Sequence, residues 1–67
     1  MLDLTINGEE RQVDAGLSVA GLLEMLQLNA KKVAVERNLE IVPKSAYAQT
    51  QLESGDRLEI VAFVGGG

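Results

Sequence analysis

The chain contains neither histidine nor cysteine, the side chains that most often serve as general base, nucleophile or metal ligand near neutral pH. We therefore expect no hydrolytic site, no metal and no bound cofactor. Asp and Glu are plentiful, and adjacent Glu9 and Glu10 could form an acid and base pair, but nothing apolar lies nearby to tune such a pair. The glycines at 8, 16 and 55 are typical of turns and form no phosphate-binding loop. The acidic side chains are interpreted as solvated surface.

The group best suited to covalent chemistry is the α-carboxylate of Gly67, which follows Gly65 and Gly66. A carboxylate is a poor acyl donor, so it needs activation, for example by attack on the α-phosphate of ATP in a separate enzyme. Glycines carry no Cβ and could pass through a narrow channel, and the stretch from Val64 to Gly67 could carry the carboxylate roughly 13 Å beyond the sheet. The alternative interpretation is an inert terminus or a trimmed linker.

Length and charge limit the possible partners. Sixty-seven residues with a net charge of −4 and a pI near 4.5 predict one small domain that repels a phosphate backbone, so nucleic acid is not expected. The acidic surface favours a protein partner with a basic docking site, or serves solubility alone. No basic-then-apolar leader and no long apolar run occurs, so we expect a cytosolic protein that does not enter a membrane.

The first half of the chain predicts a hairpin followed by one helix. Apolar residues alternate from Leu2 to Ile6, Asn7-Gly8 provides a tight turn, and a second strand ends at Val13. Apolar residues at helical spacing then predict an amphipathic helix that begins after the N-cap Ser18 and stops at Asn29. These helical positions are Val19, Leu22, Leu23 and Leu26.

The second half predicts short strands and a final long one. One short strand passes through Val33 and Val35, the chain turns at Arg37-Asn38, and a second strand runs from Glu40 to Val42 before Pro43. Tyr47 is expected to pack beneath a helical turn, and the final strand begins near Leu58. A single helix can cover only one face of a small sheet, so the sequence predicts a two-layer α+β domain over residues 1–64 with a glycine tail over 65–67.

The final strand changes character along its length. Leu58, Ile60 and Ala62 are expected beneath the helix, which places Glu59, Val61 and Phe63 on the opposite face. That face turns from charged to apolar as it approaches the tail. We interpret Val61 and Phe63, with Val64, as a patch that docks a partner, although single exposed apolar residues are also ordinary.

These elements resemble the ubiquitin-like β-grasp fold, and the whole chain is similar to the ThiS family of sulfur carriers. The similarity rests on the length, on VAVERNLEIVPK in the middle, on GDRLEIV at the last turn and on the terminal FVGGG. The resemblance implies that an E1-like adenylating enzyme of the ThiF type uses ATP to adenylate Gly67. It implies further that a sulfur donor such as a cysteine desulfurase converts the adenylate to a thiocarboxylate, while Gly65 and Gly66 thread the partner's channel.

In the ThiS family the sulfur is passed to a thiazole synthase of the ThiG type, for the thiazole ring of thiamine. The resemblance thus implies a carrier and protein cosubstrate, not an enzyme. Two alternatives share the fold and the activation: the small subunit of molybdopterin synthase and ubiquitin-like modifiers. A third alternative, of another class, is a β-grasp interaction module whose glycine tail is inert.

Overall fold

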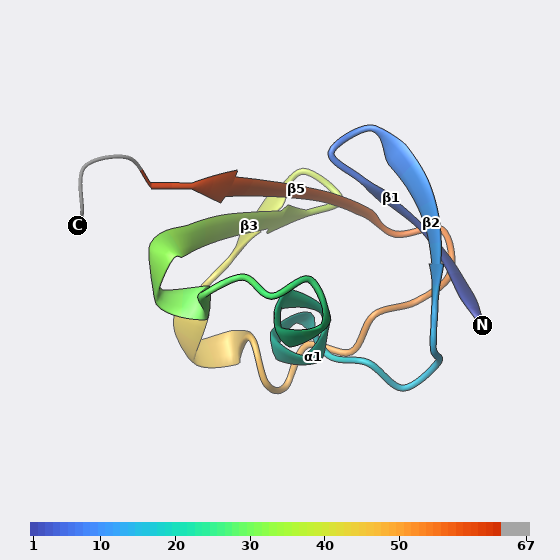
Figure 1. The fold of residues 1–67 in the computed structure, drawn as a ribbon, viewed down its shortest axis with the longest axis horizontal. Coiled ribbons are helices and arrows are strands. Elements are labelled where there is room, and N and C mark those ends of the chain that lie inside the picture. Colours follow the sequence, from blue (N-terminus) through green and yellow to red (C-terminus); the bar gives the residue numbers. More distant parts are fainter. Residues whose placement is uncertain (64–67) are drawn as a thin grey trace.

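A computed structural model describes residues 1–63 of the protein, and the ribbon is drawn in Figure 1. These residues form one five-stranded sheet in the order β2-β1-β5-β3-β4, with one α-helix on one face. The predicted α+β architecture, a mixed sheet of four to five strands on one helix, is confirmed. The elements are β1 (Leu2–Ile6), β2 (Glu9–Val13), α1 (Val19–Met25), β3 (Val33–Arg37), β4 (Glu40–Val42) and β5 (Arg57–Ala62), with two 3-10 turns, η1 (Ala30–Lys32) and η2 (Lys44–Ala46).

The first hairpin forms as the sequence predicts. β1 and β2 pair antiparallel from Leu2 opposite Val13 to Ile6 opposite Glu9. Asn7 and Gly8 occupy the turn with φ of 49° and 83°, the left-handed conformation that a two-residue primed turn requires. The Asn7 side chain also donates from Nδ2 to the carbonyl of Ile60 at 3.1 Å and accepts from the Ile60 N–H at 2.7 Å. The turn therefore fastens the hairpin to β5 as well as closing it.

The helix starts where the sequence predicts but ends earlier. The Ser18 hydroxyl accepts from the Gly21 N–H at 3.1 Å and caps α1. The predicted stop at Asn29 is wrong, because α1 ends at Met25 and Gln27 takes the left-handed conformation with φ of 61°. The N–H groups of Gln27 and Leu28 then bond the carbonyls of Glu24 and Leu23, which is the hydrogen-bond pattern of a Schellman C-terminus. Asn29 instead caps η1.

Twelve apolar side chains form the core between the sheet and α1, and all five strands and α1 contribute to it. Three of them, Val19, Leu22 and Leu23, come from the helix and are at most 1% exposed. Tyr47 is buried as predicted and donates to the Val33 carbonyl at 3.3 Å. The core consists of Leu4, Ile6, Val13, Val19, Leu22, Leu23, Val33, Val35, Val42, Tyr47, Leu52 and Leu58.

β5 is the central strand and leads toward the predicted functional end of the chain. It pairs parallel with β1 through Thr5 opposite Arg57 and Ile6 opposite Leu58, and antiparallel with β3 over a longer stretch. The β1 pairing covers only the first part of β5, while the β3 pairing extends to Ala62 opposite Val33. The last part of β5 is therefore held to the sheet by β3.

Candidate functional site at the end of β5

The open face of the sheet, away from α1, carries exposed apolar side chains near the end of β5. Val61 is 60% exposed and lies directly opposite Ala34 of β3. On the next row of that face, Glu36 lies between Glu59 of β5 and Ile41 of β4, and Ile41 is 74% exposed. Residues directly opposite each other share a face. The register thus groups Val61 with Ile41 and Ala34, beside two carboxylates.

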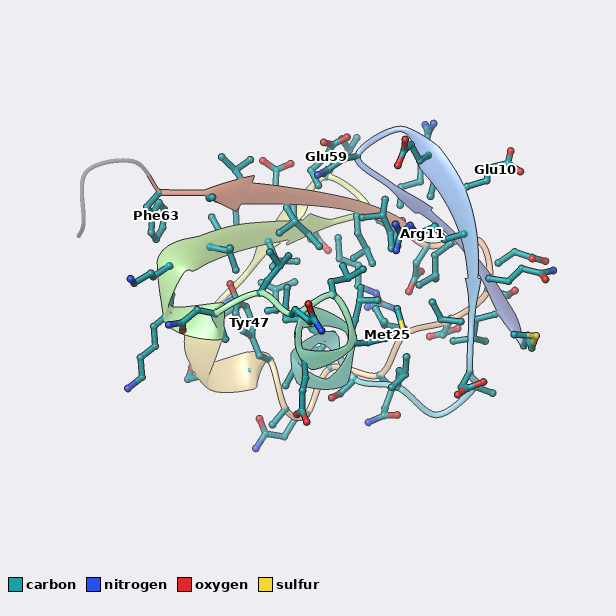
Figure 2. The ribbon with its side chains drawn as sticks, in the orientation of Figure 1. Glu10, Arg11, Met25, Tyr47, Glu59 and Phe63 are labelled. Atoms are coloured by element: carbon teal, nitrogen blue, oxygen red, sulfur yellow. The ribbon has the colours of Figure 1, made fainter. Side chains whose placement is uncertain are left out.

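Phe63 is placed differently from the sequence-based expectation. Its side chain is 50% exposed, and Figure 2 shows the ring and the Glu59 carboxylate on opposite sides of β5. Lys44 of η2 places its Nζ 4.6 Å from the centroid of the Phe63 ring, a cation–π distance. The regular alternation ends because Phe63 follows the last residue of β5. Phe63 therefore lies at the end of the sheet and does not extend the face of Glu59 and Val61.

The buried side of β5 follows the predicted alternation over most of its length. Leu58 is 1% exposed and Ile60 is partly buried against the core. Ala62 was expected beneath the helix but is exposed. The short helix does not reach under this end of the strand (Figure 1). The end of β5 is therefore accessible on both of its faces.

Four predicted site residues follow Phe63, the last residue that the structure describes. Val64, predicted to dock a partner, lies outside the described residues, and so do Gly65, Gly66 and the Gly67 carboxylate. The expected boundary between domain and tail, at 64 and 65, lies there as well. The last described contact of the main chain is the hydrogen bond from the Phe63 N–H to the Lys32 carbonyl, at 2.8 Å. The chain is thus paired with the β3 side of the sheet up to Phe63.

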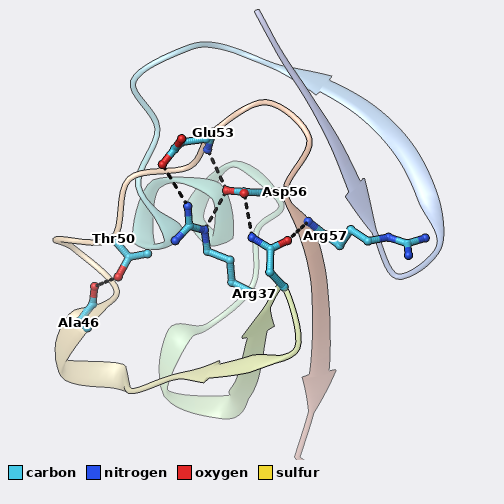
Figure 3. A network of polar contacts seen from close by, with 7 residues as sticks. Arg37, Ala46, Thr50, Glu53, Asp56 and Arg57 are labelled. Carbon is cyan, nitrogen blue, oxygen red and sulfur yellow. Dashed lines mark hydrogen bonds and ion pairs between the residues drawn. The ribbon is translucent and has the colours of Figure 1, made fainter.

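A polar network lies at the opposite end of β5, centred on the buried Asp56 (Figure 3). One carboxylate oxygen of Asp56 accepts from Arg37 Nε and from the Glu53 N–H, each at 2.8 Å, and the other accepts from Asn38 Nδ2 at 3.1 Å. The amide oxygen of Asn38 in turn accepts from the Arg57 N–H at 3.0 Å. The network therefore joins the turn between β3 and β4 to the start of β5.

The contacts of the network determine the charge of Asp56. Burial opposes its ionisation, but hydrogen bonds from the Glu53 N–H, Arg37 and Asn38 outweigh burial and hold the pKa of Asp56 below its usual value. The same pairing with Asp56 raises the pKa of Arg37, against the opposing effect of burial. Both groups are charged at neutral pH and satisfied, which is the arrangement of a structural ion pair. The network thus joins two segments that are separate in the sequence, ERN at 36–38 and GD at 55–56, because Arg37 and Asn38 both bond Asp56.

Sequence reasoning missed two exposed apolar side chains, Leu39 and Ile41. Leu39 is 92% exposed and holds φ of 71° in the turn between β3 and β4, a conformation that costs energy for a residue with a Cβ. The predicted turn at Arg37-Asn38 is shifted by one residue, because Asn38 and Leu39 are the pair with positive φ. The alternation of β4 could have identified Ile41, since its neighbour Val42 is buried.

Within residues 1–63, no cluster of three or more His, Cys, Asp or Glu could hold a metal ion. A hollow of about 360 Å³ near the β3–β4 turn is lined by Glu36, Asn38, Leu39, Arg57 and Glu59, and none of its lining residues is Val61 or Phe63. In the same described part of the chain, no helix has the length and apolar character needed to cross a bilayer. The exposed end of β5 remains the candidate site.

Comparison with known proteins identifies the family. The family model described as ThiS family matches residues 4–67, which include the glycine tail. The chain belongs to the ThiS family. The sulfur carrier protein ThiS of Bacillus subtilis is 44% identical over 66 residues, covering 96% of this chain and 98% of that protein. The crystal structure of the thiamine biosynthesis protein ThiS from Geobacter metallireducens superposes with a TM-score of 0.83 at 38% identity, over 98% of this chain and 100% of that one.

The structural match confirms the β-grasp fold predicted for this ThiS-family chain. A further relative, a thiazole synthase of Paramagnetospirillum magneticum, is 61% identical over 66 residues, which are 98% of this chain and 20% of that protein. A second thiazole synthase, of Magnetococcus marinus, is 39% identical over 66 residues, which are again 98% of this chain and 20% of that protein. The chain thus spans about a fifth of the length of these two relatives.

Proposed function

We propose that this protein is a sulfur carrier of thiamine biosynthesis, in which the Gly67 carboxylate is the reactive group. A partner enzyme would catalyse attack of that carboxylate on the α-phosphate of ATP, with release of pyrophosphate. Hydrosulfide would then displace AMP and leave a thiocarboxylate on Gly67. A persulfide donor would instead form an acyl disulfide with loss of AMP, and a thiol would have to reduce that disulfide to release the thiocarboxylate. The observation that carries the proposal is the family match, which extends through the glycine tail to residue 67. The carrier is a cosubstrate in this scheme, and the catalysis belongs to its partners.

The described structure is compatible with that role. The chain is hydrogen-bonded to the sheet up to Phe63, so the tail over 64–67 starts from a fixed point. Four extended residues reach at most roughly 13 Å beyond that point. Glycine offers no Cβ to obstruct a channel. The fold would thus hold the base of the tail while Gly65 and Gly66 pass through a channel in the partner.

The expected partners are an adenylating enzyme of the E1-like ThiF type, a thiazole synthase of the ThiG type, and a sulfur donor such as a cysteine desulfurase. Two relatives named thiazole synthase support the thiazole branch over the molybdopterin branch, because each contains a segment similar to this chain. Val61 and Phe63, both at least half exposed, would dock the partner together with Val64. ATP would be bound by the partner.

The test is the intact mass of the protein after incubation with ATP, the adenylating enzyme and a sulfur source. We expect one oxygen to be replaced by sulfur, with the change mapped to the C-terminal peptide, provided that Gly67 carries a free carboxylate in the purified protein. A variant with one residue added after Gly67 should fold normally and show no adenylation. Normal turnover of that extended variant would contradict the proposal. Full activity after removal of Gly65 to Gly67 would favour an interaction module with an inert tail.

A further inference from the structure

All three lysines of the chain lie in the two 3-10 turns near Phe63, the last residue that the structure describes. Lys31 and Lys32 belong to η1, and Lys44 belongs to η2. Figure 1 shows both turns at the end of the molecule where β5 ends. The three residues, called here the lysine cluster, are exposed. The net charge of −4 favoured a partner with a basic docking site, but this end of the molecule is itself basic and does not fit such a site.

Direct contacts connect the lysine cluster to the base of the tail. The Lys32 carbonyl accepts from the Phe63 N–H at 2.8 Å. The Lys44 Nζ lies 4.6 Å from the centre of the Phe63 ring. Among residues 1–63, Arg37 makes both of the ion pairs, to Glu53 and Asp56, so no lysine is paired with a described carboxylate. Within this described part of the chain, the Lys31 and Lys32 ammonium groups have no carboxylate partner, and the Lys44 ammonium contacts only the face of the Phe63 ring.

Charge is separated along the long direction of the sheet. The segments next to the end of β5, over 30–35, 43–46 and 60–63, contain the three lysines and no Asp or Glu. The nearest carboxylates along β3 and β5 are Glu36 and Glu59, which lie opposite each other farther from the tail. Asp56 and Glu53 lie at the other end of β5. The molecule thus has a basic end at the tail and an acidic remainder.

We propose that the lysine cluster docks on carboxylates of the adenylating enzyme, and that these carboxylates surround the entrance of the channel that binds the tail. The inference rests on the proposed function. Phosphates of ATP are a poorer fit, because an extended tail of four residues places the reacting carboxylate roughly 13 Å away from the base of the tail. The ammonium groups would therefore meet the surface around the entrance and not the nucleotide. Complementary charge of this kind orients an encounter and accelerates association more than it adds affinity.

The experiment measures association of the carrier with its adenylating enzyme by stopped-flow fluorescence, at low and at high salt. In the test variant, Lys31 and Lys32 are both replaced by Glu. A matched control replaces Arg57 and Arg11 by Glu, which gives the same change in net charge away from the tail. We expect the test variant to associate roughly tenfold more slowly at low ionic strength, with the difference shrinking at high salt. The control should change the association rate constant by less than about threefold. Replacement of both lysines by Arg keeps the positive charge and should leave the association rate constant unchanged.

Each outcome has a defined meaning. Equal slowing of test and control variants would overturn the inference, because only total charge would then matter. A raised KM for ATP at saturating carrier concentration, with unchanged association, would assign the lysines to the nucleotide and also overturn it. Circular dichroism checks that each variant is folded, and the exposed Lys44→Glu variant repeats the test at the second turn. If the unaltered protein is not adenylated at all, the proposed function fails. If the unaltered protein is adenylated and the Lys31 and Lys32 variant associates and is activated normally, only the inference about the lysines fails.

Discussion

Replacement of Asp56 tests whether the network at the start of β5 stabilises the fold as its geometry indicates. Asp56 accepts three hydrogen bonds, from Arg37, Asn38 and the Glu53 N–H. Hydrogen bonds to charged groups contribute about 1.5–3 kcal/mol each but are not additive within a network. We expect Asp56→Ala to lower the free energy of unfolding by about 3 kcal/mol. A chain of 67 residues has a total of only roughly 3–10 kcal/mol, so this loss is large.

The effect of pH on this network has a definite sign. The folded state holds the pKa of Asp56 below the unfolded value of 3.8, so the unfolded chain binds a proton more readily. The stabilisation from Asp56 is therefore complete above the unfolded value and is lost as pH falls below it toward the folded pKa. Asp56→Asn removes the titrating group. We expect this variant to be less stable than the unaltered protein near neutral pH, with the gap narrowing in the acid range.

Urea denaturation followed by far-ultraviolet circular dichroism measures both effects, at about pH 7 and at steps below about pH 4. Asp14→Asn is the matched control, because Asp14 is an exposed carboxylate that makes no side-chain hydrogen bond among the described residues. A loss below about 1 kcal/mol for Asp56→Ala would refute the reasoning, since a single neutral hydrogen bond contributes as much. Equal acid sensitivity of the Asp56→Asn variant and the unaltered protein would refute the pH argument.

Two further predictions concern β5. Val61→Asp should weaken binding of the adenylating enzyme severalfold, as measured by calorimetry. It should cost less than about 1 kcal/mol of stability, because Val61 is 60% exposed. A large loss of stability would show that Val61 is part of the core. Asn7→Ala should cost about 2 kcal/mol in urea denaturation, because Asn7 bonds both backbone groups of Ile60 and holds φ of 49°. Asn7→Gly, which keeps the turn but not the side chain, should separate these two contributions.

The sequence determined most of the fold because its signals were local. Asn7-Gly8 fixed the first turn, Ser18 fixed the start of α1, and alternation identified β5. The end of α1 could not be predicted in this way, since Gln27 adopts a left-handed conformation that glycine or asparagine usually takes at a helix end. That conformation is accompanied by the Schellman hydrogen bonds of Gln27 and Leu28, which no local propensity of these two residues indicates.

The candidate site was less predictable, because it depends on where elements end. Alternation assigned Phe63 to the face of Glu59 and Val61, but β5 ends at Ala62, and the ring turns away from the Glu59 carboxylate toward Lys44 (Figure 2). The pairing of Lys44 with Phe63 joins residues nineteen positions apart, so no local pattern could indicate it. The lysine cluster has the same origin, since it forms only when folding brings η1 and η2 to the same end of the molecule (Figure 1).

The motifs that made the family recognisable from sequence divide into two physical groups. ERN and GD meet in the network of Arg37, Asn38 and Asp56, where both charges are already satisfied within the fold. That network leaves little capacity to bind a partner, so its residues are explained by stability. The side chains near the end of β5 are the reverse case. The three lysines, Val61 and Phe63 are exposed and form no ion pair among the described residues. Mutations of Arg37, Asn38 and Asp56 should therefore lower stability without changing the association rate of the folded protein. Mutations of the lysines, Val61 and Phe63 should change the association with the partner and leave stability nearly unchanged.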